Sequence, residues 1–257
     1  MTMCWWDKEV RYFSRGPRAG VDFCWYTSLF PCVPAEETRA VYEGSPDYLV
    51  MPEASVAHMA RRLGTSARLV AIFRNPADRF YSAYNMGMNE AMHRKGPETS
   101  YAGFAASLDR FIACAPECPS EKHVVSMFFE YGMYAKHLRT YFKHFARSRL
   151  LVLCSEDYYS NPASTMMQLL EFAQLSTTSE VLTLVAGSEG VRRNRGSEWG
   201  GNYTGKLLGR ERDKLQAFYA PHNKELYALI GRDFGWDRVG ATARSQPLVA
   251  HRPIVEL

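Results

Sequence analysis

An arginine stands at the end of an apolar run, at a position where it could bind a phosphate. Residues 69–73 (Leu-Val-Ala-Ile-Phe) have the length and β-branched content of a buried strand, and Arg74 follows directly. Asn75 and Pro76 then supply a helix N-cap and a proline at the first helical position. Anionic ligands bind where the strands of an open α/β sheet end and helices begin. The spacing predicts that Arg74 and the Ser82 hydroxyl meet on one phosphate, but it equally fits an ordinary strand-to-helix turn with a surface arginine.

A second apolar run, at residues 149–154, has the same character and leads to Asn161 and Pro162, again an N-cap followed by proline. Short strands are expected around residues 9–13 and 40–43. Apolar residues at helical spacing follow the second proline, namely Met166, Leu169, Leu170 and Ala173. Strands that alternate with helices indicate an α/β fold in which helices cover both faces of a parallel sheet.

Five segments of the chain, in order, resemble one family. The motif from Arg74 to Tyr84 (Arg-Asn-Pro-x-x-Arg-x-x-Ser-x-Tyr) is similar to the 3′-phosphate-binding motif of sulfotransferases that use 3′-phosphoadenosine-5′-phosphosulfate (PAPS). The strongest resemblance is to the heparan sulfate N- and O-sulfotransferases and related carbohydrate sulfotransferases. The other four similar segments are residues 8–13 (Lys-Glu-Val-Arg-Tyr-Phe), 25–31 (Trp-Tyr-Thr-Ser-Leu-Phe-Pro), 43–48 (Glu-Gly-Ser-Pro-Asp-Tyr) and 132–138.

The resemblance implies a fold like that of the P-loop kinases and a sulfuryl transfer from PAPS to a hydroxyl or amine of a carbohydrate acceptor. Such a transfer is an in-line displacement in which positioning and charge stabilisation dominate. It needs a base for the acceptor proton, cations for the sulfuryl oxygens and the leaving phosphate, and a pocket for the 3′-phosphate. PAPS is therefore the expected co-substrate, and no metal is expected.

The family motifs imply a role for individual residues around the nucleotide. Glu9 takes the place of the catalytic base, with a surface salt bridge as its alternative role, and Lys8 is expected near the 5′ side of the nucleotide. Arg74 and Ser82 are expected to bind the 3′-phosphate, the arginine through its bidentate fork. Arg79, three residues before Ser82, is expected to be a charge on the helix surface.

Two further segments are assigned by the same resemblance. Residues 195–200 align best with a late Lys-Gly-Arg-x-Tyr-Pro loop that closes over the nucleotide phosphates. Arg195 would replace the lysine of that loop, or would simply be exposed to solvent, and Gly196 is the one identical residue. Glu43 and Ser45 are expected to shape the acceptor side.

Three departures from the family pattern also lie on the acceptor side. Arg11, assigned to acceptor binding, stands where the family usually has histidine, and Ser14 stands where the glucosaminyl 3-O-sulfotransferases have aspartate. Gly44 replaces a lysine. The departures at Arg11 and Ser14 argue against a heparan-like acceptor.

The first strand of the family and its glycine-rich loop, which holds the 5′-phosphosulfate, have no counterpart in this sequence. No G-x-x-x-x-G-K-[ST] motif is present, and no strand precedes the glycine-rich residues 200–206. We therefore expect an N-terminally incomplete sulfotransferase domain over residues 1–239, inactive as it stands, and a loose tail over 240–257. The alternatives are a non-catalytic relative that binds the nucleotide or an anionic glycan, and a fragment of a P-loop kinase or NTPase. The kinase is disfavoured because no apolar strand ends in a Walker B-like aspartate with a matching Walker A loop.

Composition is that of one globular domain, with 46% hydrophobic and 23% charged residues in 257. The net charge of +4 suits an anionic ligand or glycan and is too small to argue for nucleic-acid binding. No apolar run reaches the roughly 18 residues of a membrane helix, and no signal peptide is recognisable. A Golgi location therefore follows from the resemblance alone, and membrane attachment would need an anchor that this chain does not carry. The six cysteines lack the spacing of a zinc site.

Overall fold

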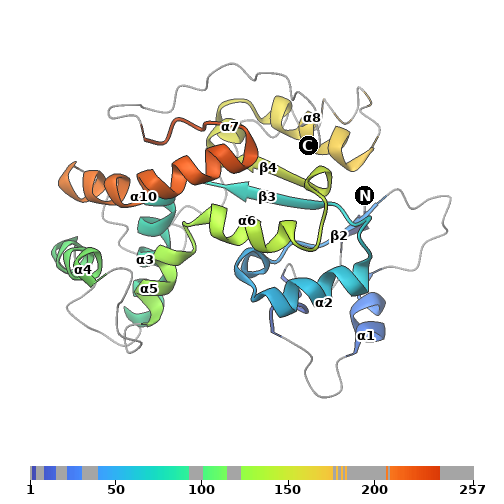
Figure 1. Ribbon diagram of the computed structural model, residues 1–257, viewed down its shortest axis with the longest axis horizontal. Coiled ribbons are helices and arrows are strands. Elements are labelled where there is room, and N and C mark those ends of the chain that lie inside the picture. Colours follow the sequence, from blue (N-terminus) through green and yellow to red (C-terminus); the bar gives the residue numbers. More distant parts are fainter. Residues whose placement is uncertain are drawn as a thin grey trace.

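The fold is built around two parallel strands, β3 (Leu69–Phe73) and β4 (Leu150–Cys154), which pair in register along their whole length (Figure 1). The computed structural model describes residues 2–3, 9–15, 22–30, 40–92, 101–114, 123–175, 178, 181, 183, 207 and 209–237. A second parallel pair joins β1 (Thr2–Met3) to β2 (Val41–Tyr42). Both apolar runs singled out in the sequence are strands, so these two predictions are confirmed.

One predicted strand is wrong. Residues 9–13 do not form a strand, although β2 lies where the strand around residues 40–43 was expected. Arg11 has a φ of 56°, in the left-handed region that interrupts an extended chain. Its backbone N–H donates to the Ser45 hydroxyl at 2.9 Å instead of joining a ladder. The strand that pairs with β2 therefore lies earlier in the chain, in β1.

Helices lie on both sides of the central strand pair (Figure 1). α6 (Tyr134–Phe142) and α10 (Gly209–Ile230) share a buried cluster with Phe73 and Cys154, the last residues of β3 and β4. α7 (Ser155–Ser160) and α8 (Pro162–Ala173) follow β4 and lie across the pair from α6. The predicted α/β fold, with a parallel sheet between helices, is confirmed.

The two faces of β3 are covered unequally. Side chains alternate between the faces of a strand, so Ala71 and Phe73 point toward α6 and α10 while Val70 and Ile72 point the other way. The side chain of Ile72 is 65% exposed and that of Val70 is 42% exposed. This face of β3 therefore presents apolar surface to solvent.

The helix after β3 begins as its capping residues predict. α3 (Pro76–Met92) starts at the proline, and the Asn75 side chain accepts a hydrogen bond from the backbone N–H of Ala77 at 3.0 Å. α3 packs with α4 (Tyr101–Cys114), α5 (His123–Glu130) and α10 around a cluster that includes Phe80. Asn161 caps α8 in the same way, through the backbone N–H of Ser164 at 3.0 Å.

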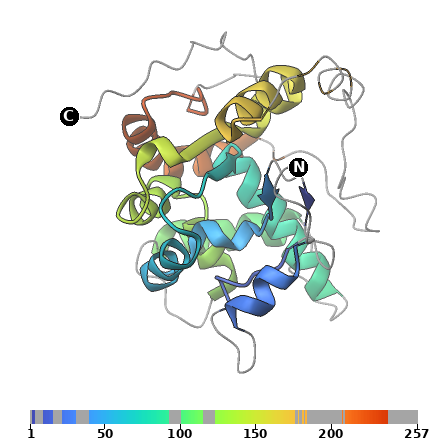
Figure 2. The same ribbon diagram turned by 90° about the vertical axis from the view of Figure 1, so that its right-hand side faces the viewer.

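A separate aromatic cluster holds the segments that are predicted to form the acceptor side. α1 (Phe23–Ser28) and α2 (Glu53–Leu63) lie at the opposite end of the molecule from α7 and α8 in both views (Figures 1 and 2). The rings of Tyr12 and Tyr26 stack with 4.8 Å between centroids, and Phe13 packs beside them. This cluster fixes residues 9–15 against η1 (Pro46–Val50); the short η4 (Arg147–Arg149) precedes β4.

Candidate functional site

Arg74 lies at the carboxyl end of β3, immediately before α3, as the sequence predicts. Its side chain is exposed. The guanidinium makes no hydrogen bond or ion pair with any of the residues that the structure describes. A cation at the end of a parallel strand, beside a helix N-terminus, has the geometry of an anion site.

Ser82 is half-buried on α3, about two helical turns beyond its start. Arg74 and Ser82 therefore belong to the same strand-helix unit, β3 and α3. The convergence of Arg74 and Ser82 on one phosphate stays a prediction.

Arg79 is not the helix-surface charge that the sequence suggests. Its Nη2 donates to the backbone carbonyl of Phe128, and its guanidinium lies 6.0 Å from the centroid of the Tyr131 ring. Its Nε is buried without a hydrogen-bond partner. Arg79 is therefore half-buried and links α3 to the end of α5.

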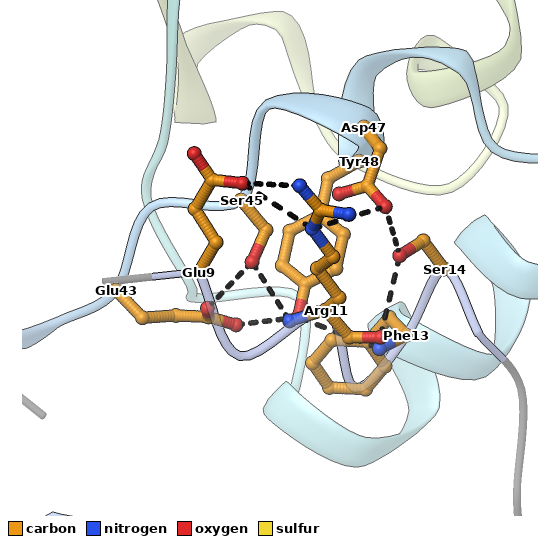
Figure 3. A network of polar contacts seen from close by, with 8 residues as sticks. All are labelled: Glu9, Arg11, Phe13, Ser14, Glu43, Ser45, Asp47 and Tyr48. Carbon is orange, nitrogen blue, oxygen red and sulfur yellow. Dashed lines mark hydrogen bonds and ion pairs between the residues drawn. The ribbon is translucent and has the colours of Figure 1, made fainter. Parts of the chain in front are cut away.

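Glu43 is the centre of a polar network on the predicted acceptor side (Figure 3). Its carboxylate accepts hydrogen bonds from the hydroxyls of Tyr48 at 2.6 Å, Ser45 at 3.0 Å and Tyr26 at 3.2 Å. The Ser45 hydroxyl also accepts the backbone N–H of Arg11. The predicted residues Glu43, Ser45 and Arg11 are thus brought together, and Glu43 acts as an anchor for three other groups.

Glu9 and Arg11 form an ion pair within the same network (Figure 3). The Arg11 guanidinium donates to one Glu9 carboxylate oxygen through Nη2 at 2.6 Å and Nε at 3.2 Å. Its Nε also lies 4.0 Å from Asp47, whose carboxylate accepts the Ser14 hydroxyl at 2.7 Å. The salt bridge that the sequence leaves open for Glu9 is present, while 27% of its side chain stays exposed.

The tyrosines near these groups are donors rather than bases. Burial and the neighbouring Glu43 carboxylate raise the pKa of Tyr48 well above its ordinary value. Burial likewise raises the pKa of Tyr141, whose hydroxyl donates to the backbone carbonyl of Tyr48. These hydroxyls keep their protons at neutral pH, so among the groups of this network a carboxylate is the better proton acceptor.

Other predicted positions lie outside the described residues, and the sequence overlooked two contacts. Lys8, Arg195, Gly196 and the tail 240–257 are among the positions that the structure does not describe. Tyr134 and Glu156 both bond to the backbone next to Arg74, and the sequence did not indicate either contact. A signal for Glu156 existed, because it follows β4 at the same edge of the sheet where Arg74 follows β3.

The residues that the structure describes hold no cluster of three or more His, Cys, Asp and Glu side chains that could bind a metal ion. They also include no helix long and apolar enough to cross a membrane.

Fold and site together define an α/β protein in which an exposed arginine lies between the end of a parallel strand and the start of a helix. Residues 33–188, more than half of the chain, match the family described as "Sulfotransferase domain". The chain therefore belongs to the sulfotransferase domain family, and the predicted family is confirmed.

Sequence relatives agree with this assignment, and a solved structure has the same fold. Mouse heparan sulfate glucosamine 3-O-sulfotransferase 3A1 is 25% identical over 240 residues, which cover 89% of this chain and 56% of that protein. The human bifunctional heparan sulfate N-deacetylase/N-sulfotransferase 3 is 27% identical over 236 residues, covering 87% of this chain and 26% of that protein. The chain thus spans about half the length of the 3-O-sulfotransferase relative. A crystal structure of a sulfotransferase from Alicyclobacillus acidocaldarius has the same fold, with a TM-score of 0.63, 23% identity, and coverage of 92% of this chain and 88% of that one.

Proposed function

We propose that this chain carries the sulfotransferase domain of an enzyme that moves a sulfuryl group from PAPS to a hydroxyl or amine of a carbohydrate acceptor. PAPS would supply the activated sulfuryl group. Family membership and the names of the relatives support the reaction class. By the same relationship we place the enzyme in the Golgi, at its membrane or in its lumen.

Arg74 and Ser82 would bind the 3′-phosphate of the nucleotide, and Arg195 and Gly196 would close over its other phosphates with Lys8 near the 5′ side. The observation that carries the proposal is the exposed guanidinium of Arg74 at the end of β3. Its planar fork matches two phosphate oxygens. The adjacent N-terminus of α3 adds positive potential at the same place.

On the acceptor side, Glu9 would take the proton from the attacking group. Arg11, Glu43 and Ser45 would shape the surface on which the acceptor lies. Arg11 donates both of its hydrogen bonds to Oε2 of Glu9, so part of the carboxylate is engaged before any acceptor binds. Acceptor binding beside Arg11 is one way to release it.

The test is calorimetric titration of the chain with 3′-phosphoadenosine-5′-phosphate and with adenosine 5′-monophosphate, which lacks the 3′-phosphate. We expect tighter binding of the 3′-phosphorylated nucleotide. A charge-assisted phosphate contact contributes roughly 1.5–3 kcal/mol, so Arg74→Ala should weaken that binding by about ten- to a hundredfold. Arg68→Ala is the matched control, because Arg68 is also exposed but stands at the other end of β3. Equal affinity for the two nucleotides, or equal effects of the two alanine variants, would refute the 3′-phosphate site.

A non-catalytic relative that binds the nucleotide or an anionic glycan is the second candidate. The ion pair between Glu9 and Arg11 favours it, because the proposed base is already engaged by a cation. A labelled-sulfate transfer assay on the full-length gene product, with a panel of polysaccharides and oligosaccharides, separates the two candidates. Nucleotide binding without any transfer supports the non-catalytic relative, whereas transfer that Arg74→Ala abolishes supports the enzyme.

A further inference from the structure

The peptide group between Arg74 and Asn75 is held from both sides. Its carbonyl oxygen accepts a hydrogen bond from the Tyr134 hydroxyl at 2.9 Å. Its N–H donates to Oε1 of Glu156 at 2.8 Å. Both polar atoms of the group that joins β3 to α3 are therefore bound by side chains from other elements, at the residue that presents the exposed guanidinium.

The Tyr134 side chain is rigidly placed. It is 3% exposed and opens α6, and its ring stacks on Phe73 with 4.1 Å between centroids and 4° between planes. Burial raises the pKa of Tyr134 to about 12, so the hydroxyl keeps its proton and donates. The hydroxyl is thus held in front of the Arg74 carbonyl by the packing of its own ring.

The Glu156 side chain is braced on the neighbouring strand. Its second oxygen, Oε2, accepts from the Cys154 thiol at 2.9 Å and from the Ser155 hydroxyl at 3.2 Å. Cys154 is the last residue of β4 and pairs with Phe73 at the end of the ladder. The carboxylate therefore ties β4 to Asn75, two residues beyond the point where backbone pairing of the two strands stops.

We propose that Tyr134 and Glu156 are positioning residues that aim the Arg74 guanidinium at the 3′-phosphate, an inference that rests on the proposed function. A bidentate contact needs its two N–H groups within a few tenths of an ångström of their acceptors. The side chain of Arg74 is long and exposed, so its direction depends on the backbone from which it starts. By fixing both ends of the following peptide group, Tyr134 and Glu156 fix that starting direction.

The experiment measures binding of 3′-phosphoadenosine-5′-phosphate and adenosine 5′-monophosphate by the purified chain and its variants. Tyr134→Phe and Glu156→Ala should weaken binding of the 3′-phosphorylated nucleotide by about three- to tenfold, the share of one hydrogen bond, and leave the other nucleotide unaffected. Glu156→Gln keeps an oxygen for the Asn75 N–H and should restore binding. In an Arg74→Ala background, neither variant should cause further loss.

Tyr219→Phe is the matched control. Tyr219 is fully buried and its hydroxyl also donates to a backbone carbonyl, that of Phe129 at 3.1 Å, in a different cluster from the end of β3. Its removal should leave the preference for the 3′-phosphate unchanged. If Glu156→Ala does not fold, Glu156→Asp, which is one methylene shorter, replaces it.

The outcomes separate this inference from the proposed function. If Arg74→Ala leaves the preference for the 3′-phosphate unchanged, the proposed function itself fails. If Arg74→Ala removes the preference but Tyr134→Phe and the Glu156 variants keep it, the positioning role is overturned. Equal losses with and without Arg74, or an equal loss in Tyr219→Phe, would also overturn it, because the effect would then be one of general stability.

Discussion

Removing the Glu43 carboxylate should destabilise the acceptor side far more than removing an exposed glutamate. Three hydroxyl groups converge on Glu43, from Tyr26 on α1, Tyr48 on η1 and Ser45 in the preceding turn. The side chain of Tyr26 is buried and Ser45 is 8% exposed, so water cannot easily replace the lost acceptor. Glu43→Ala leaves all three donors without this partner.

The size of the effect follows from the geometry of these bonds. A hydrogen bond to a charged group contributes about 1.5–3 kcal/mol. The three hydrogen bonds share one carboxylate, so their contributions are not additive. For Glu43→Ala we therefore expect a loss of about 3–5 kcal/mol in the free energy of unfolding. This is a large part of the roughly 5–15 kcal/mol that stabilises an ordinary domain. Glu43→Gln should cost only about 1–2 kcal/mol, because its amide oxygen can still accept from both tyrosines, which share Oε1.

Urea denaturation followed by tryptophan fluorescence measures the difference. Glu53→Ala is the control, since Glu53 is an exposed carboxylate on α2 that pairs with Lys143 at 2.6 Å, and its loss should change stability little. A double-mutant cycle of Glu43→Ala with Tyr48→Phe should give a coupling energy of about 1–3 kcal/mol. If Glu43→Ala unfolds at the same urea concentration as Glu53→Ala, the network does not anchor the acceptor side.

Three further perturbations test other parts of the molecule. In the full-length gene product, Glu9→Gln should lower the rate of labelled-sulfate transfer by about 10²–10⁴-fold with unchanged nucleotide affinity; near-normal turnover would assign the base elsewhere. Ile72 is 65% exposed on β3, and we expect this apolar face to promote self-association of the protein. Ile72→Thr should therefore reduce self-association in analytical ultracentrifugation without loss of stability, because threonine keeps strand propensity. An unchanged sedimentation profile would contradict this role of Ile72. Burial lowers the pKa of His137, whose Nε2 donates to the Glu130 carbonyl at 2.9 Å. The contribution of this neutral histidine to stability is complete above the pKa of about 6.5 in the unfolded chain, and it is lost as the pH falls through the lower pKa of the folded protein. The urea concentration at the unfolding midpoint should therefore decrease when the pH is lowered from about 7.5 to about 5.5, and it should decrease less in His137→Gln; equal decreases in both proteins would exclude this contribution.

The features that the sequence predicts correctly depend on neighbouring residues. β3 and β4 are apolar runs, and the starts of α3 and α8 are set by Asn75 and Asn161 with the prolines that follow them. In each case the decisive interaction spans only a few residues, so the local sequence contains it. The position of Arg74 follows from the same local pattern.

The features that the sequence does not predict depend on contacts between distant segments of the chain. The backbone N–H of Arg11 bonds to Ser45, which is 34 residues away, and this contact replaces the strand expected over residues 9–13. Arg79 reaches the carbonyl of Phe128, 49 residues away, and is half-buried instead of extending from the helix surface. The Glu156 carboxylate accepts a hydrogen bond from the backbone N–H of Asn75. Every residue except proline has such an N–H, so the pattern of side chains does not reveal this partner.

The two halves of the proposed site are prepared for binding to different degrees. Arg74 is exposed, and its backbone is already held by Tyr134 and Glu156, so nucleotide binding need not break a contact between its guanidinium and the part of the chain that the structure describes. Glu9, by contrast, is bonded to Arg11 before any acceptor arrives. Nucleotide affinity should therefore persist in any form of the protein that keeps the fold, whereas the proposed transfer would use a carboxylate that Arg11 already engages. A measurement on Glu9 and Arg11, rather than on Arg74, distinguishes an enzyme from a relative that only binds.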